Sequence, residues 1–95
     1  MKKFNEKVAI VTGASAGIGQ AAAISFAKEG AKVCVADINE AGMLETASLI
    51  KEFGGEVITV VTNVADEAAC KNMVEQTVNK FGRLDVIFNN AGICG

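Results

Sequence analysis

The chain has 95 residues, of which 51% are hydrophobic and 21% charged, and its formal net charge is −2 at pH 7. This composition excludes an intrinsically disordered chain, and the length suits one domain at most. The acidic balance and the lack of a Lys/Arg run exclude the electrostatic footprint of a nucleic-acid or anionic-membrane partner, so we expect neither.

Short apolar runs alternate with amphipathic stretches along the chain. The pattern predicts strands at 7–12, 32–36, 56–61 and 85–88, and helices at 18–29, about 39–53, and 66–81. Glycine follows each predicted helix, as is usual at a helix C-terminus. Strands that are apolar on both faces and alternate with helices predict an α/β fold, a doubly wound parallel sheet in the order βαβαβαβ.

Helical spacing also predicts which side of each helix is buried. The predicted faces are Ile18, Ala22, Phe26 and the neighbouring alanines on the first helix, Met43, Ala47 and Ile50 on the second, and Cys70, Val74, Thr77 and Phe81 on the third. Right-handed crossovers give strand order 3-2-1-4, with the first two helices on one face and the third on the other. The fourth strand is then an unprotected apolar edge, so we expect a homo-oligomer or a self-associating chain.

The stretch VTGASAGIGQ, residues 11–20, lies between the first predicted strand and the first helix. Its glycines allow either a tight turn or the close approach of backbone N–H groups to a phosphate at a helix N-terminus. Gly13, Gly17 and Gly19 do not have the spacing G-x-G-x-x-G, and Gln20 stands where a P-loop has lysine. A P-loop kinase or GTPase is therefore excluded.

Thr12 to Gly19 matches the pattern TGxxxGIG, and on this basis the chain resembles the short-chain dehydrogenase/reductase family. Further motifs follow in the family's order: Asp37 at the end of the second strand, Asn63-Val64 after the third, Phe81-Gly82-Arg83-Leu84-Asp85 before the fourth, and Asn89-Asn90-Ala91-Gly92 after it. The resemblance covers the whole chain. It implies a Rossmann fold, of which residues 1–95 would be the N-terminal part of a single NAD(P)-binding domain.

The resemblance implies cofactor contacts by Gly13, Ser15, Gly17, Ile18, Gly19, Asp37, Ile38, Asn63, Val64, Asn89, Asn90, Ala91 and Gly92. Several of these residues have a structural alternative. Asp37 could be a solvated strand end or a helix cap rather than a ribose ligand, and Asn63 could form an Asx turn rather than contact adenine. Asn89 and Asn90 could tie neighbouring strand ends together.

Asp37 also bears on the choice of cofactor. A carboxylate accepts hydrogen bonds from the ribose hydroxyls of NAD but repels the 2′-phosphate of NADP, which needs a nearby cation. The loop residues Ala14, Ser15 and Ala16 are uncharged. NAD is therefore expected over NADP.

The family's catalytic Ser and Tyr-x-x-x-Lys group lie beyond the NNAG motif, and this chain contains no tyrosine. No catalytic residue can be assigned, so hydride transfer between nicotinamide and an alcohol or carbonyl substrate is expected of a longer parent protein. Two alternatives remain open: a non-catalytic NAD-binding module or truncated product, and an S-adenosylmethionine-dependent methyltransferase, whose loop is usually closer to G-x-G-x-G.

The cysteines and the N-terminus indicate the compartment. Cys34, Cys70 and Cys94 are widely spaced and odd in number, and the chain has no histidine, so neither a disulfide framework nor a metal site is expected. The first apolar run ends at Thr12, too soon for a signal sequence or a membrane span. We expect a cytoplasmic protein with reduced thiols.

Overall fold

The computed structural model describes residues 4–92. Its elements are β1 (Val8–Thr12), α1 (Gly17–Lys28), β2 (Lys32–Asp37), α2 (Glu40–Glu52), β3 (Val57–Val61), α3 (Glu67–Phe81) and β4 (Val86–Asn89). The predicted order of strands and helices is confirmed, and the predicted boundaries differ only at the ends of elements.

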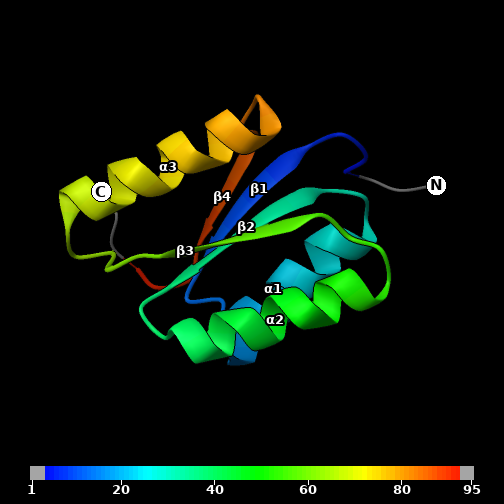
Figure 1. The fold of residues 1–95 in the computed structure, drawn as a ribbon, viewed down its shortest axis with the longest axis horizontal. Helices are drawn as coiled ribbons and strands as arrows, with labels where there is room; N and C mark the ends of the chain where they lie inside the picture. The colour runs from blue at the N-terminus through cyan, green and yellow to red at the C-terminus, as the bar shows by residue number, and fades with distance from the viewer. Residues whose placement is uncertain (1–3, 93–95) are drawn as a thin grey trace.

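The four strands form one parallel sheet in the order β3-β2-β1-β4, as predicted. Figure 1 shows α1 and α2 together on one face of the sheet and α3 on the other. This is part of a doubly wound Rossmann fold. Because β1 lies between two neighbours and under helices on both faces, all its residues are buried.

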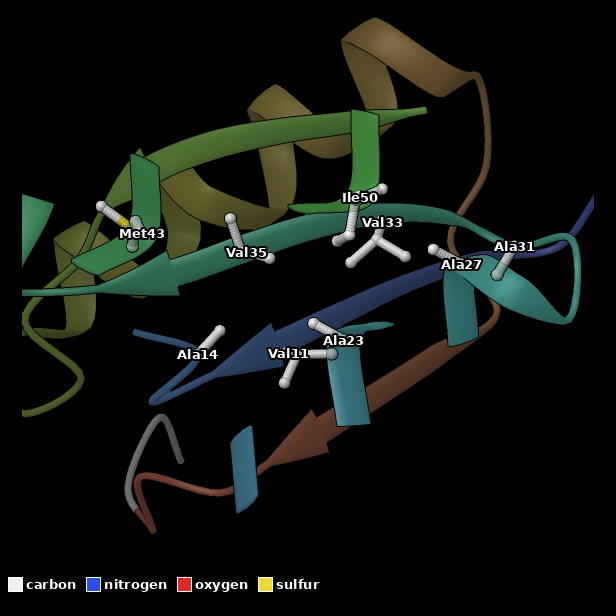
Figure 2. Close-up of a cluster of buried hydrophobic side chains, with 9 residues drawn as sticks. All are labelled: Val11, Ala14, Ala23, Ala27, Ala31, Val33, Val35, Met43 and Ile50. Carbon is white, nitrogen blue, oxygen red and sulfur yellow. The ribbon is translucent and has the colours of Figure 1, made fainter. Parts of the chain in front are cut away.

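The larger core lies between the sheet and the helix pair α1 and α2 (Figure 2). It contains Val11, Ala14, Ala23, Ala27, Ala31, Val33, Val35, Met43 and Ile50. The buried residues that α1 contributes to it, Ala23 and Ala27, are small and let the helix backbone approach the strands closely.

The predicted face of α1 is confirmed for its alanines Ala23 and Ala27 and is wrong for Ile18. The buried residues of α1 are Gly19, Ala23 and Ala27, whereas Ile18 is 72% exposed. Close packing on the sheet buries the small side chains, while Ala22 and Phe26 pack on this core and are partly buried. Phe26 lies at the side of this core and makes edge-to-face contacts with Phe4 and Phe88.

The second core lies under α3 and is smaller. Ile10, Cys34, Ala36, Val60 and Met73 are buried there. Burial raises the pKa of the Cys34 thiol to about 11, although a hydrogen bond with Thr77 opposes this. Cys34 is free, as expected. Cys94 lies outside the described residues.

The helix ends follow local rules. Asn39 caps α2 by accepting a hydrogen bond from the Gly42 N–H, and Asp66 caps α3 by accepting from Ala68 and Ala69. Gly82 ends α3 at φ 83°, in the left-handed region that favours glycine.

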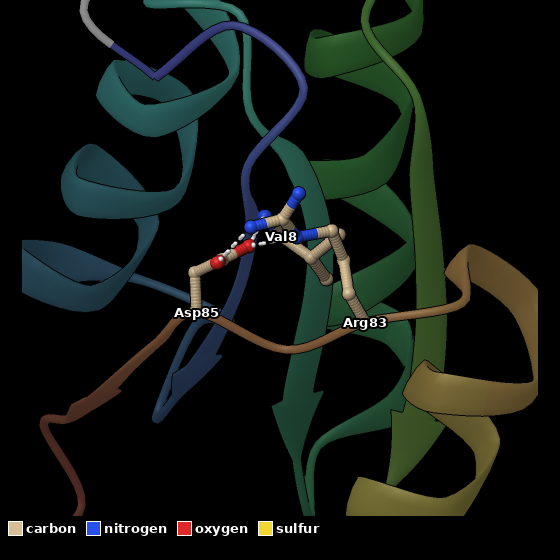
Figure 3. A network of polar contacts seen from close by, with 3 residues as sticks. All are labelled: Val8, Arg83 and Asp85. Carbon is tan, nitrogen blue, oxygen red and sulfur yellow. Dashed lines mark hydrogen bonds and ion pairs between the residues drawn. The ribbon is translucent and has the colours of Figure 1, made fainter.

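The start of β4 is fixed to the centre of the sheet by a polar network (Figure 3). Asp85 Oδ2 accepts hydrogen bonds from the Val8 N–H and from Arg83 Nε, both at 2.9 Å. An Arg83 nitrogen also lies 2.6 Å from Asp85 Oδ1. The network holds the beginning of the edge strand against β1.

Candidate functional site

The carboxyl ends of the strands meet at one edge of the sheet. The register pairs Thr12 of β1 with both Ala36 of β2 and Asn89 of β4, and Asp37 with Val61 of β3. The loops that follow these strands therefore come together, although they are far apart in the sequence. In open parallel sheets this edge, beside the central strands, is where ligands bind.

The glycine loop between β1 and α1 has two tightly packed glycines and one open glycine. A side chain on Gly19 would collide with the Gly13 carbonyl group, so this glycine allows α1 to pack on the loop. Gly17 has φ 59° and an added Cβ would meet no atom within 4 Å. Gly13 also has positive φ, and an added Cβ would lie 2.9 Å from the Asn90 side-chain nitrogen.

Asp37 lies beside this loop, at the end of β2. Its Oδ2 accepts a hydrogen bond from the Ser15 N–H at 3.1 Å, and its Oδ1 accepts one from the Asn39 N–H at 3.0 Å. Burial raises the pKa of the carboxyl group, but the hydrogen bonds from Asn39 and Ser15 outweigh it, and the pKa lies below its usual value. Asp37 is therefore ionised at neutral pH and remains partly exposed.

Asn89 and Asn90 join the end of β4 to the end of β1. Asn89 Oδ1 accepts hydrogen bonds from the Thr12 hydroxyl at 3.0 Å and from the Gly92 N–H at 3.1 Å. The Asn90 side-chain amide donates to the Gly13 carbonyl oxygen at 3.4 Å. The sequence left two roles open for these asparagines, a cofactor contact and a tie between strand ends. The structure shows the hydrogen bonds that tie the strand ends together.

A cavity of about 110 Å³ lies between these strand ends. It is lined by Gly13, Asp37, Ile38, Thr62, Asn63, Val64 and Ala91. Asn63 Oδ1 accepts a hydrogen bond from the Ala65 N–H, which is the Asx turn considered from the sequence. The other predicted residues, Ser15, Gly17, Ile18, Gly19, Asn89, Asn90 and Gly92, do not line this cavity.

Two threonines of the site were missed from the sequence. Thr12 is fully buried, and its hydroxyl donates to Asn89 and accepts from the Ala91 N–H at 3.1 Å. Thr62 lines the cavity, and its N–H donates to the Asp37 carbonyl oxygen. The position of each threonine at the end of a predicted strand is the feature of the sequence that could have identified it as a site residue.

Within residues 4–92, no group of three or more His, Cys, Asp or Glu side chains could hold a metal ion. In the same range no helix is long and apolar enough to cross a bilayer.

The comparisons with known proteins agree with this geometry. The family model described as short chain dehydrogenase matches residues 7–95. An uncharacterized oxidoreductase of Thermotoga maritima is 49% identical over 90 residues, covering 95% of this chain and 35% of its own length. A CLA biosynthesis dehydrogenase/reductase of Lactiplantibacillus plantarum is 43% identical over 93 residues, which are 98% of this chain and 32% of that protein. The chain thus spans about a third of the length of these curated relatives.

Solved structures show the same fold. A hydroxysteroid dehydrogenase from Escherichia coli superposes with a TM-score of 0.88 at 34% identity, covering 90% of this chain and 37% of the other. A short chain dehydrogenase/reductase from Burkholderia phymatum, in complex with NAD, gives a TM-score of 0.87 at 33% identity, covering 92% and 31%. Sequence motifs, sheet order and the match over residues 7–95 together show that this chain belongs to the short-chain dehydrogenase family.

Proposed function

We propose that this chain forms the dinucleotide-binding part of an NAD-dependent short-chain oxidoreductase. The observation that carries the proposal is the position of an ionised Asp37 beside the open Gly17 segment of the glycine loop. The nicotinamide cofactor supplies a hydride acceptor or donor when it is bound. The residues of this chain would bind and orient that cofactor.

The glycine loop and the start of α1 fit a pyrophosphate group. The space around a Cβ added at Gly17 is empty to 4 Å, so an anion can approach the backbone there. No acidic side chain lies in the first turn of α1, and the partial positive charge of a helix N-terminus attracts a phosphate. Ile18, which is exposed at this helix start, would lie against the same ligand.

Asp37 fits the ribose hydroxyls of NAD and opposes the 2′-phosphate of NADP. Each carboxylate oxygen accepts one backbone hydrogen bond, and a carboxylate oxygen has a second lone pair. The neighbouring loop residues 14–16 carry no cation that could neutralise a phosphate. We expect Asn63, Val64 and Ile38, which line the cavity beside Asp37, to contact the adenosine half of the cofactor.

The proposal assigns binding to this chain and assigns the chemistry to a longer protein. Its 95 residues include no tyrosine, so the family's Tyr-x-x-x-Lys group is not among them. We expect the 95-residue chain to transfer no hydride by itself. The family match does not support the methyltransferase alternative, and the NAD complex of the Burkholderia phymatum protein supports a nicotinamide cofactor.

Titration with NAD and NADP tests the cofactor proposal. In the full protein that carries this chain, we expect NAD to bind at least about tenfold more tightly than NADP, a difference of roughly 1.4 kcal/mol. Asp37→Ala also removes the acceptor of the Ser15 N–H. A loss of affinity that is equal for both cofactors would therefore reflect a change in the conformation of the glycine loop. The ratio of the two affinities isolates the repulsion of the 2′-phosphate, and it should fall toward one in this variant.

Equal affinities of the wild-type protein for NAD and NADP would contradict the proposed preference. No binding of either cofactor, with S-adenosylmethionine raising the melting temperature instead, would favour the methyltransferase. NAD binding without hydride transfer by the full protein would leave a non-catalytic NAD-binding module.

A further inference from the structure

A buried hydroxyl group on α2 is hydrogen-bonded to the backbone of the glycine loop. Thr46 is fully buried, and its Oγ1 lies 2.7 Å from the Ala14 carbonyl oxygen and 3.2 Å from the Gly42 carbonyl oxygen. A hydroxyl has one hydrogen, and the shorter distance places it on Ala14. Gln20 of α1 donates its side-chain N–H to the same Oγ1 at 3.0 Å. Thr46 therefore links the loop to both helices that flank it.

The hydrogen bond from Thr46 is accepted by Ala14, a buried residue of the glycine loop. Ala14 is fully buried, and its N–H points to the Ala36 carbonyl oxygen of β2 at 3.4 Å. Its carbonyl oxygen takes the Thr46 hydroxyl, 32 residues away in the sequence. Without that donor, a buried carbonyl group would lose its partner, which carries a large free-energy penalty in a protein interior. Relaxation of such a group would move the loop.

Gly42, one turn before Thr46, touches the next loop residue. A Cβ added at Gly42 would lie 2.5 Å from Ser15 Cβ and 3.1 Å from the Ser15 carbonyl oxygen. The backbone of α2 therefore packs directly on Ser15. Alanine is a better helix former than glycine, so the absence of a side chain here serves the contact and not the helix.

We propose that Thr46 and Gly42 are positioning residues for the dinucleotide site. They hold Ala14 and Ser15 in the backbone conformation in which the Ser15 N–H bonds to Asp37. The inference rests on the proposed function, because it assigns the loop to a bound dinucleotide. Neither residue belongs to the motifs that carried the family resemblance.

Thr77 of α3 supplies a matched control for Thr46. It is also fully buried, but its hydroxyl donates within its own helix, to the Met73 carbonyl oxygen at 2.8 Å. It lies on α3, which covers the face of the sheet opposite α1 and α2. Gly55 matches Gly42 in the same way, since an added Cβ would lie 2.5 Å from an Ile50 side-chain carbon and 3.1 Å from the Ile50 carbonyl oxygen.

The experiment measures NAD affinity by calorimetric titration of the full protein. Thr46→Val should weaken binding by about threefold or more, the order expected for one hydrogen bond, and Thr46→Ser should restore it to within about twofold. Thr77→Val should lower the melting temperature and leave affinity within about twofold of wild type. If Thr46→Val does not fold, Gly42→Ala against Gly55→Ala gives the same comparison.

Backbone amide exchange without cofactor provides a second measurement. We expect faster exchange at Ser15, Ala16 and Gly17 in Thr46→Val and unchanged exchange there in Thr77→Val. A wild-type protein that binds no NAD would overturn the proposed function. NAD binding by the wild type, with equal affinity and equal loop exchange in Thr46→Val and Thr77→Val, would overturn the positioning role alone.

Discussion

At the scale of single residues, one carboxylate joins the first and last strands. Asp85 accepts hydrogen bonds from Val8, 77 positions earlier, and from Arg83. The hydrogen bond from Arg83 is the main cause that holds the pKa of the Asp85 carboxyl group below its usual value, and the Val8 N–H adds to it. The same hydrogen bond raises the pKa of the Arg83 guanidinium.

This network predicts a pH dependence of stability. A carboxyl group whose pKa is lower in the folded protein stabilises it fully above the unfolded value of 3.8, and that contribution is lost as the pH falls below 3.8. Asp85→Asn should therefore lower the melting temperature at neutral pH, and the difference from wild type should shrink in acid. Calorimetric scans across this range provide the measurement, and melting curves that differ equally at all pH values would contradict the prediction.

Asn63 shows what a motif cannot predict about a residue. Its place after β3 was evident from the sequence, but the same position allows an Asx turn and a ligand contact. In the structure its side-chain oxygen accepts the Ala65 N–H. Only the folded backbone decides between such local hydrogen bonds, because an asparagine can satisfy its amide in several ways.

At the scale of helices, α3 differs from α1 and α2, which together cover one face of the sheet. The face of the sheet opposite α1 and α2 is covered by this one helix within the described residues 4–92. Its N-terminus is capped by Asp66, whose Oδ1 accepts from the Ala68 N–H at 2.9 Å and the Ala69 N–H at 3.3 Å. The negative charge also complements the positive end of the helix.

We expect Asp66→Ala to lower the free energy of unfolding by about 1 kcal/mol, as is typical for loss of a helix cap. Asp66→Asn keeps an acceptor oxygen and should lose less. Denaturant titration measures both, and the order of the two variants is the decisive result. An alanine variant as stable as the asparagine variant would show that the cap contributes nothing here.

The helices also show where sequence patterns stop being informative. The existence of α1 was predicted correctly, but its apolar face was assigned to Ile18, Ala22, Phe26 and the neighbouring alanines, and Ile18 is exposed. Periodicity identifies an apolar stripe by size and hydrophobicity, whereas α1 packs on the sheet through Gly19, Ala23 and Ala27. For α2 the predicted Met43, Ala47 and Ile50 are all buried, and Thr46 joins them. The hydroxyl of Thr46 in this buried face of α2 is explained by its hydrogen bond to the Ala14 carbonyl oxygen on the loop.

At the scale of the whole molecule, the order of strands was predictable and the support of the site was not. Parallel connections of one hand leave few sheet orders, so the strand ends that carry Asp37 and Asn89 could be placed together from sequence. The contact of Thr46 with Ala14 depends on the packing of two elements that no local pattern encodes. Motifs therefore predicted which loops form the site and missed what holds them.

The open side of the molecule has apolar side chains on both faces of β4. Ile87 is 48% exposed on the α3 face, and Phe88 borders an apolar cavity of about 180 Å³ on the α1 face, together with Phe4 and Phe26. Beyond β4 no further strand pairs with it in residues 4–92. A sheet edge with exposed apolar side chains favours association with another chain.

We therefore expect the 95-residue chain, studied by itself, to self-associate. Light scattering should give a mean mass that rises with concentration. Ile87→Lys places a charge on the exposed part of the edge strand, so it should shift the population toward the monomer, since edge lysines oppose strand pairing. Val61→Lys is the matched control on the opposite edge, because Val61 of β3 is 52% exposed and lies far from β4 in the sheet order. A concentration-independent monomer mass with a sharp melting transition would contradict this expectation, and an equal response to both lysine variants would assign the association to general surface charge instead of to β4.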